Sequence, residues 1–105
     1  MSAIVKFFLK NPEKKKMGEI VVISRENMLL LGNFLPTTEF QPCEELFREF
    51  ECAVNDQLFK EVERLEEAIQ GLNFYLTDSP LDENIFEIED LQIMKDGVSF
   101  RLRSS

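Results

Sequence analysis

The sequence predicts an α+β domain, a mostly antiparallel sheet with one long amphipathic helix packed on one face. Two observations predict this class: paired apolar runs near both ends of the chain, and a single stretch of helical period between them. The predicted order along the chain is β-β-β-α-β-β-β. With 105 residues and 44% apolar content, residues 1–105 fit one domain.

Three strands are expected before the helix. Residues 3–9 alternate in the manner of a strand with a partly wet second face. Two apolar runs follow at 19–24 and 28–32, and the polar Ser-Arg-Glu-Asn segment between them predicts a hairpin. The basic run at 14–16 lies among turn residues and is interpreted as a solvated turn.

The segment between this hairpin and the helix, residues 33–42, is predicted to be a loop. It contains two prolines and shows no helical period. Its large apolar residues Phe34, Leu35 and Phe40 are expected to fold back onto the core, because exposing all three in one loop would be costly.

A long amphipathic helix is predicted between residues 43 and 72, because apolar residues recur at helical spacing. Cys52 and Phe59, seven apart, conflict with this pattern by falling together on the polar side, and Glu61 projects toward the apolar stripe. A break at Asn55-Asp56 would relieve these conflicts, since Asn and Asp favour caps over helix interiors. One continuous helix and two segments therefore both remain open. The stripe consists of Cys43, Leu46, Phe47, Phe50, Ala53, Val54, Leu58, Val62, Leu65, Ala68, Ile69 and Leu72.

Three strands are expected after the helix. Residues 72–77 read as a strand, and residues 78–84 as a loop or a single helical turn. Residues 85–103 then form a hairpin around a Lys-Asp-Gly turn. A β-bulge near Glu89 and Asp90 would keep the apolar residues of the incoming strand facing inward.

The sequence offers no basis for a catalytic, cofactor or metal site. It has no His, which removes the commonest general base, and two Cys cannot supply the usual four zinc ligands. Its four Gly are scattered singly, so no phosphate-binding loop is present. The carboxylates between Asp78 and Asp90 lack the spacing of a calcium loop and are interpreted as a solvated face, with divalent-metal binding as the alternative. We expect a protein that is not an enzyme and carries no cofactor.

Compartment and partner class follow from the cysteines, the apolar runs and the charge. No run approaches the roughly 20 apolar residues of a membrane span, and the N-terminus lacks the features of a signal peptide. Cys43 and Cys52 lie too far apart along a helix for a disulfide, which suits the reducing cytoplasm. The net charge of −8 opposes binding to nucleic acid or anionic lipid and favours a basic protein partner.

The candidate partner surface is the polar side of the helix. Residues 44–70 hold nine carboxylates and three basic side chains. The i,i+4 pairs Glu44–Arg48 and Asp56–Lys60 would compensate little of this charge, and a face kept acidic only for solubility is the alternative interpretation. The candidate residues are Glu45, Glu49, Cys52, Asp56, Phe59, Glu63, Glu66 and Glu67.

These features predict a binding module that neutralises a basic partner, in the way that immunity proteins cover the substrate site of nuclease toxins. Carboxylates would then stand in for phosphates. The alternative is a structural module that forms a homo-oligomer through the helix or an edge strand, with Phe59 and Cys52 as the self-interface. In a continuous helix these two residues would be exposed and would mark an interface; a break at Asn55-Asp56 is expected to remove the anomaly.

Overall fold

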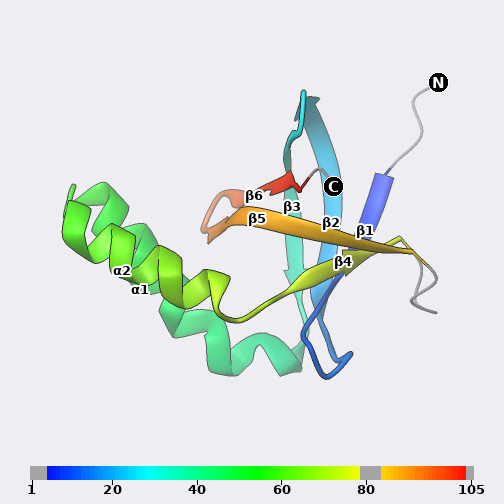
Figure 1. Cartoon of the computed structure of the whole chain (residues 1–105), viewed down its shortest axis with the longest axis horizontal. Helices are drawn as coiled ribbons and strands as arrows, with labels where there is room; N and C mark the ends of the chain where they lie inside the picture. Colours follow the sequence, from blue (N-terminus) through cyan, green and yellow to red (C-terminus); the bar gives the residue numbers. More distant parts are fainter. Residues whose placement is uncertain (1–4, 79–83, 104–105) are drawn as a thin grey trace.

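The computed structural model describes residues 5–78 and 84–103, and its elements follow the predicted order along the chain (Figure 1). A single helical turn, η1, precedes two α-helices, so the broken form of the predicted helix is the one observed. The elements are β1 (Val5–Lys10), β2 (Lys16–Glu26), β3 (Leu29–Pro36), η1 (Thr38–Phe40), α1 (Gln41–Asn55), α2 (Phe59–Gln70), β4 (Tyr75–Thr77), β5 (Ile85–Met94) and β6 (Gly97–Leu102).

The six strands close into an antiparallel barrel in the order β1-β2-β3-β6-β5-β4, whereas the prediction was a mostly antiparallel sheet with a helix on one face and no assigned strand order. The short strand β4 closes it by pairing with β1 on one side and β5 on the other, so that Thr77 lies opposite both Phe8 and Ile85. The α+β class and the antiparallel pairing are therefore right. The prediction that a helix covers one face of the sheet is wrong, because a closed sheet fills its interior with its own side chains.

The barrel interior is packed with large apolar side chains from all sides. Leu9, Ile20, Leu76 and Phe100 are 0% exposed. The Phe7 ring packs edge-on against Phe100, with ring centroids 6.3 Å apart. Rings in this arrangement attract each other beyond the area that they bury, so the core is held by both burial and geometry.

The β2–β3 hairpin is longer than predicted, and the predicted loop begins too early. Residues 33–36 form the end of β3, paired with β2 from Val21 to Gly18. Phe40 is buried and meets the half-buried Phe34 ring at 5.0 Å, as expected. Leu35 is 55% exposed and does not fold back, because it lies on the outer face of the strand.

The last hairpin confirms two details of the prediction. The register of β5 against β6 shifts between Glu89 and Gln92, and Asp90 has φ 54°, so a bulge lies where it was expected. Ile88 and Leu91 are both buried as a result. The predicted loop or turn at 78–84 falls mostly on residues 79–83, which lie outside the described residues.

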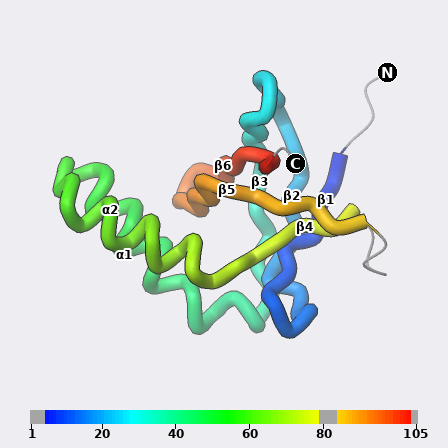
Figure 2. Tube along the Cα trace, viewed as in Figure 1, coloured from blue at the N-terminus to red at the C-terminus, as the bar shows by residue number. Residues whose placement is uncertain are grey.

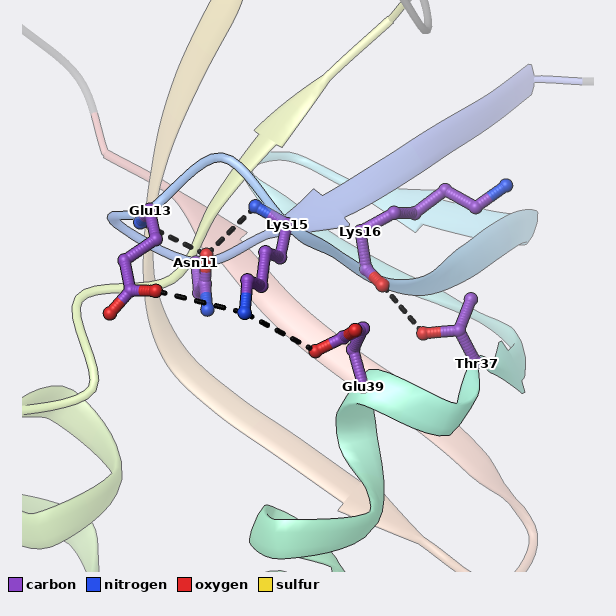
Figure 3. A network of polar contacts seen from close by, with 6 residues as sticks. All are labelled: Asn11, Glu13, Lys15, Lys16, Thr37 and Glu39. Atoms are coloured by element: carbon purple, nitrogen blue, oxygen red, sulfur yellow. Dashed lines mark hydrogen bonds and ion pairs between the residues drawn. The ribbon is translucent and has the colours of Figure 1, made fainter.

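Lys14 and Lys15 of the basic run lie in the turn between β1 and β2, as predicted, whereas Lys16 begins β2, and the charge of the run is partly compensated. Asn11 Oδ1 accepts hydrogen bonds from the backbone N–H groups of Glu13 and Lys15, which shapes the turn (Figure 3). The Lys15 ammonium lies 3.9 Å from a carboxylate oxygen of Glu13 and of Glu39. Glu19 on β2 accepts hydrogen bonds from the side chains of Lys6 and Lys16, and these hold the pKa of its carboxyl below the ordinary value. The bond from Lys6 has the larger effect. The turn is thus tied to η1 through Glu39.

Candidate functional site

The two α-helices form a hairpin that extends away from the barrel (Figure 1). The chain trace in Figure 2 shows α1 and α2 side by side, joined at the end farthest from the strands. Both helices contact β5, and Glu51 of α1 is bonded to the β5–β6 turn, whereas the connection between α1 and α2 lies at the end farthest from the strands (Figure 2). The far end of the hairpin therefore has few partners other than the two helices themselves.

Of the two alternatives that the sequence left open, the structure has the break after Asn55, and a Schellman motif produces it. The N–H of Leu58 donates to the carbonyl of Ala53 at 2.9 Å, and the N–H of Gln57 donates to that of Val54 at 3.2 Å. Gln57 has φ 56°, the left-handed conformation that this motif requires. The break thus begins at Asp56, as the Asn-Asp pair indicated, but Gln57 adopts the strained backbone.

Gln57→Gly is expected to stabilise the chain by about 0.5–1 kcal/mol. Glycine adopts the left-handed conformation without the steric cost that a β-carbon brings, and this gain exceeds its greater freedom in the unfolded chain at such a position. Urea unfolding monitored by circular dichroism would measure the change. Gln57→Val, which penalises the same backbone further, should be destabilising; a stabilising valine would contradict this account of the turn.

Apolar side chains remain exposed at the far end of the hairpin. Of the predicted stripe, Phe47, Phe50, Ala53, Leu65 and Ile69 are buried. The stripe is not buried throughout, because Val54 is 38% exposed and Leu58 49% exposed. Phe59, the first residue of α2, is 74% exposed, the highest value among the large apolar side chains described. We call Val54, Leu58 and Phe59 the hairpin tip.

The expectation that a break would remove the anomaly at Phe59 is wrong. The break does free Glu61 from the apolar stripe, and its carboxylate is exposed and paired with Arg64. It also separates Phe59 from Cys52, since the two now lie on different helices. Leu58, and not Phe59, lines a groove together with Cys52. The Phe59 ring lies in solvent at the end where α1 and α2 join, the end farthest from the strands (Figure 2).

The groove between the two helices, the interhelix groove, brings together half of the predicted site residues. Its volume is about 310 Å³, and Glu45, Glu49, Cys52 and Asp56 line it. Glu66 and Glu67 line a separate hollow of about 230 Å³, where α2 meets β5. Glu63 lines neither and is exposed. The predicted set is therefore distributed over several sides of the hairpin and does not form one patch.

The hairpin keeps most of its negative charge uncompensated. Arg64 donates to Glu61 Oε2 at 2.7 Å, and this hydrogen bond, with the charges of Glu61 and Glu49, raises the pKa of Arg64. The predicted pairs Glu44–Arg48 and Asp56–Lys60 do not form within the described residues. The Asp56–Lys60 pair does not form because Asp56 lies in the turn, and i,i+4 neighbours face each other only within one continuous helix.

A larger groove was missed by the sequence reasoning. Its volume is about 800 Å³, and it lies between the end of β3, one side of α1 and the β5–β6 turn. No local signal marks it, because its walls come from segments far apart in the chain. The assignment of 33–36 to a loop also hid the strand that forms one wall.

The described residues contain neither a cluster of metal ligands nor a membrane-spanning helix. Within them, no three Cys, Asp or Glu side chains gather closely enough to hold a metal ion; Asp82 and Glu83 lie outside them. Neither α1 nor α2 has the length and apolar content of a bilayer-spanning helix. Cys43 and Cys52 are free thiols, as predicted, and burial raises the pKa of Cys43.

Comparisons of the chain with protein-family models, with curated proteins and with solved structures found no match.

Proposed function

We propose that this chain is a cytoplasmic binding protein without catalytic activity, and that its acidic helical hairpin captures and neutralises a basic protein partner. The observation that carries the proposal is the 74% exposure of Phe59 on a hairpin rich in uncompensated carboxylates. An exposed aromatic ring costs solubility, and interface cores are enriched in aromatic residues. A partner that covers the ring would remove that cost.

The hairpin tip and its surroundings have the composition of an interaction hot spot. Val54, Leu58 and Phe59 supply apolar area that a partner can desolvate. Asp56 in the turn and Glu63 on the next turn of α2 are exposed carboxylates of the same end. Lys and Arg on a partner would find both an apolar anchor and charged acceptors there.

A nuclease toxin is the partner class that we propose. Such enzymes present clustered cations to bind phosphates, and an acidic surface can occupy those cations in place of nucleic acid. The chain would then act as an inhibitor at one-to-one stoichiometry. A captured partner with no activity on nucleic acid would leave the binding proposal in place and remove this class.

The test is the salt dependence of association with a partner captured from the source cell by the full chain. We expect the on-rate to fall at least about tenfold as salt rises from about 50 mM to about 500 mM, because screening removes electrostatic steering. Glu49→Lys should slow association at low salt. Glu26→Lys, the same charge change at the end of β2, is the matched control and should have a smaller effect. An on-rate that is indifferent to salt would refute the electrostatic part of the proposal.

The second candidate is self-association through the hairpin tip. The same exposed apolar side chains favour it, since two tips could cover each other. In that case the acidity only keeps the assembly soluble. A dimer at micromolar concentration, detected by sedimentation velocity and dissociated by Phe59→Asp, would identify this function.

A further inference from the structure

Part of one edge of strand β3, residues 33–36, has no neighbouring strand among the described residues. It pairs with β2 from Leu29 to Pro36, but with β6 only from Leu29 to Gly32. Strand β6 begins at Gly97, where the chain turns back toward β5. Residues 33–36 therefore have no strand on their β6 side within the described part of the chain. Unpaired strand edges are templates for the addition of another strand.

The backbone of Phe34 faces this open side. A β-carbon placed on Gly97 would lie 2.6 Å from the carbonyl oxygen of Gly32, so that carbonyl points toward β6. The backbone N–H and C=O groups of residues two apart on a strand point to the same side of it. The N–H and C=O of Phe34 therefore point to the β6 side of β3, as the carbonyl of Gly32 does. The carbonyl oxygen of Leu35 faces β2 instead, 2.8 Å from a β-carbon placed on Gly18. Within the described residues, neither backbone group of Phe34 has a hydrogen-bond partner on the open side.

The open edge forms one wall of the 800 Å³ groove, which we call the β3 groove. The opposite walls come from α1 and from the β5–β6 turn. Glu51 Oε1 accepts the backbone N–H of Lys95 at 2.9 Å, which holds that turn against α1 and fixes the end of the groove. The half-buried side chains of Phe34 and Met94 give it apolar surface, and the buried Phe40, Phe47 and Ile93 lie beneath them. Its volume is within the range of roughly 300–1,000 Å³ typical of ligand sites.

The charged side chains that line the β3 groove favour an occupant with positive charge. Glu44, Glu51 and Asp96 are the carboxylates that line it, against Arg48 and Lys95. Glu44 and Asp96 have no ion-pair partner within the described residues. The groove is thus acidic by one charge in a chain of net charge −8, which favours an occupant that carries cations.

We infer that the β3 groove binds an extended peptide segment of another protein, which adds to the edge of β3 as a further strand. The N–H and C=O of Phe34 form the central backbone hydrogen bonds. An apolar side chain of the peptide packs against Phe34 and Met94, and a neighbouring Lys or Arg faces Glu44 or Asp96. Backbone bonds supply affinity in this mode, and the pockets for alternate side chains supply specificity. The site does not include the hairpin tip and does not depend on the proposed function.

A phage-displayed library of random heptapeptides, selected against the full chain, tests the inference. The enriched peptides should alternate apolar and basic residues. A synthetic copy, added at saturation, should slow hydrogen exchange at the Phe34 amide about tenfold or more, because that N–H gains a partner. If no enriched peptide slows exchange at Phe34, the inference is wrong.

N-methylation of single peptide amides separates strand addition from simple apolar binding. Methylation of the amide that donates to Phe34 should weaken binding about tenfold, and methylation of the next amide, which points away, should weaken it much less. Equal effects at both positions would overturn the strand geometry. Since only the peptide is altered, folding of the protein is not at issue.

Two protein variants and one measurement on the chain alone complete the test. Glu44→Lys should weaken peptide binding several-fold, and Glu26→Lys, the same charge change outside the groove, should not. A peptide whose binding is lost in Phe59→Asp and kept in Glu44→Lys belongs to the hairpin tip and counts against the inference. A chain that is dimeric by itself, with the Phe34 amide already protected, would make a second copy the occupant and also overturn it.

Discussion

Phe59→Asp is expected to lower the affinity for the basic partner by about 30-fold or more, which is about 2 kcal/mol. The substitution removes the largest exposed apolar side chain of the hairpin tip and places a carboxylate where the partner must exclude water. Because Phe59 is 74% exposed, the free energy of unfolding should change by only about 0.5 kcal/mol or less. Isothermal titration calorimetry and urea unfolding measure the two quantities.

Ile23→Asp is the matched control for this variant. Ile23 is 67% exposed on β2, outside the helical hairpin. The same replacement of an exposed apolar side chain by Asp should therefore leave the affinity for the partner nearly unchanged there. Equal losses in both variants would point to the added charge and not to the hairpin tip. A wild-type dimer that Phe59→Asp converts to a monomer would favour self-association.

Phe100→Ala should destabilise the fold by about 3–5 kcal/mol, because it removes a buried ring and leaves a cavity. Phe100 is 0% exposed and packs edge-on against Phe7 inside the barrel. A loss of this size is a large fraction of the total stability of a domain, which is usually about 5–15 kcal/mol. Urea unfolding followed by circular dichroism gives the difference from wild type.

Two further variants keep this prediction testable if Phe100→Ala does not fold. Phe100→Leu retains most of the volume and should be less destabilising, by about 1.5 kcal/mol or less. Phe59→Ala makes the same truncation at an exposed ring and should change stability by about 0.5 kcal/mol or less. Equal losses at Phe100 and Phe59 would contradict the placement of the core inside the barrel.

Much of the element order could be predicted because its signals are local. The Lys-Asp-Gly turn, the bulge at Asp90 and the two runs of the β2–β3 hairpin depend on residues close together in the chain. The helix break depends on hydrogen bonds between residues five apart or fewer. Local chemistry of this kind leaves a readable pattern.

The predictions that were wrong concern positions whose conformation depends on contacts with segments far away in the chain. Residues 33–36 lack a strand pattern of their own and become strand because β2 lies beside them. Pro36 is tolerated there because Leu35 faces β2, which directs the nitrogen of Pro36 to the open side, where no ladder bond is lost. Propensity alone therefore ended the strand too early.

The candidate site was predictable in composition and not in arrangement. The sequence indicated that the helical segment is acidic and that Phe59 does not fit its apolar stripe. It could not show that Leu58 would accompany Cys52, or that the acids would spread over the interhelix groove and the hollow near β5. Those placements depend on how α1 and α2 pack against each other and against β5.

The sequence by itself determined the α+β class, the order of elements, the turn chemistry and the acidity of the hairpin, because each depends on residue type and short-range spacing. Only the tertiary structure decided that the sheet closes into a barrel through β4, that Phe59 stays in solvent despite the helix break, and that β3 keeps an open edge. Alternation of apolar residues marks which side of a strand is buried, and it is the same for an open and a closed sheet. Which strands meet, and which side chains are left uncovered, depends on the packing of the whole chain.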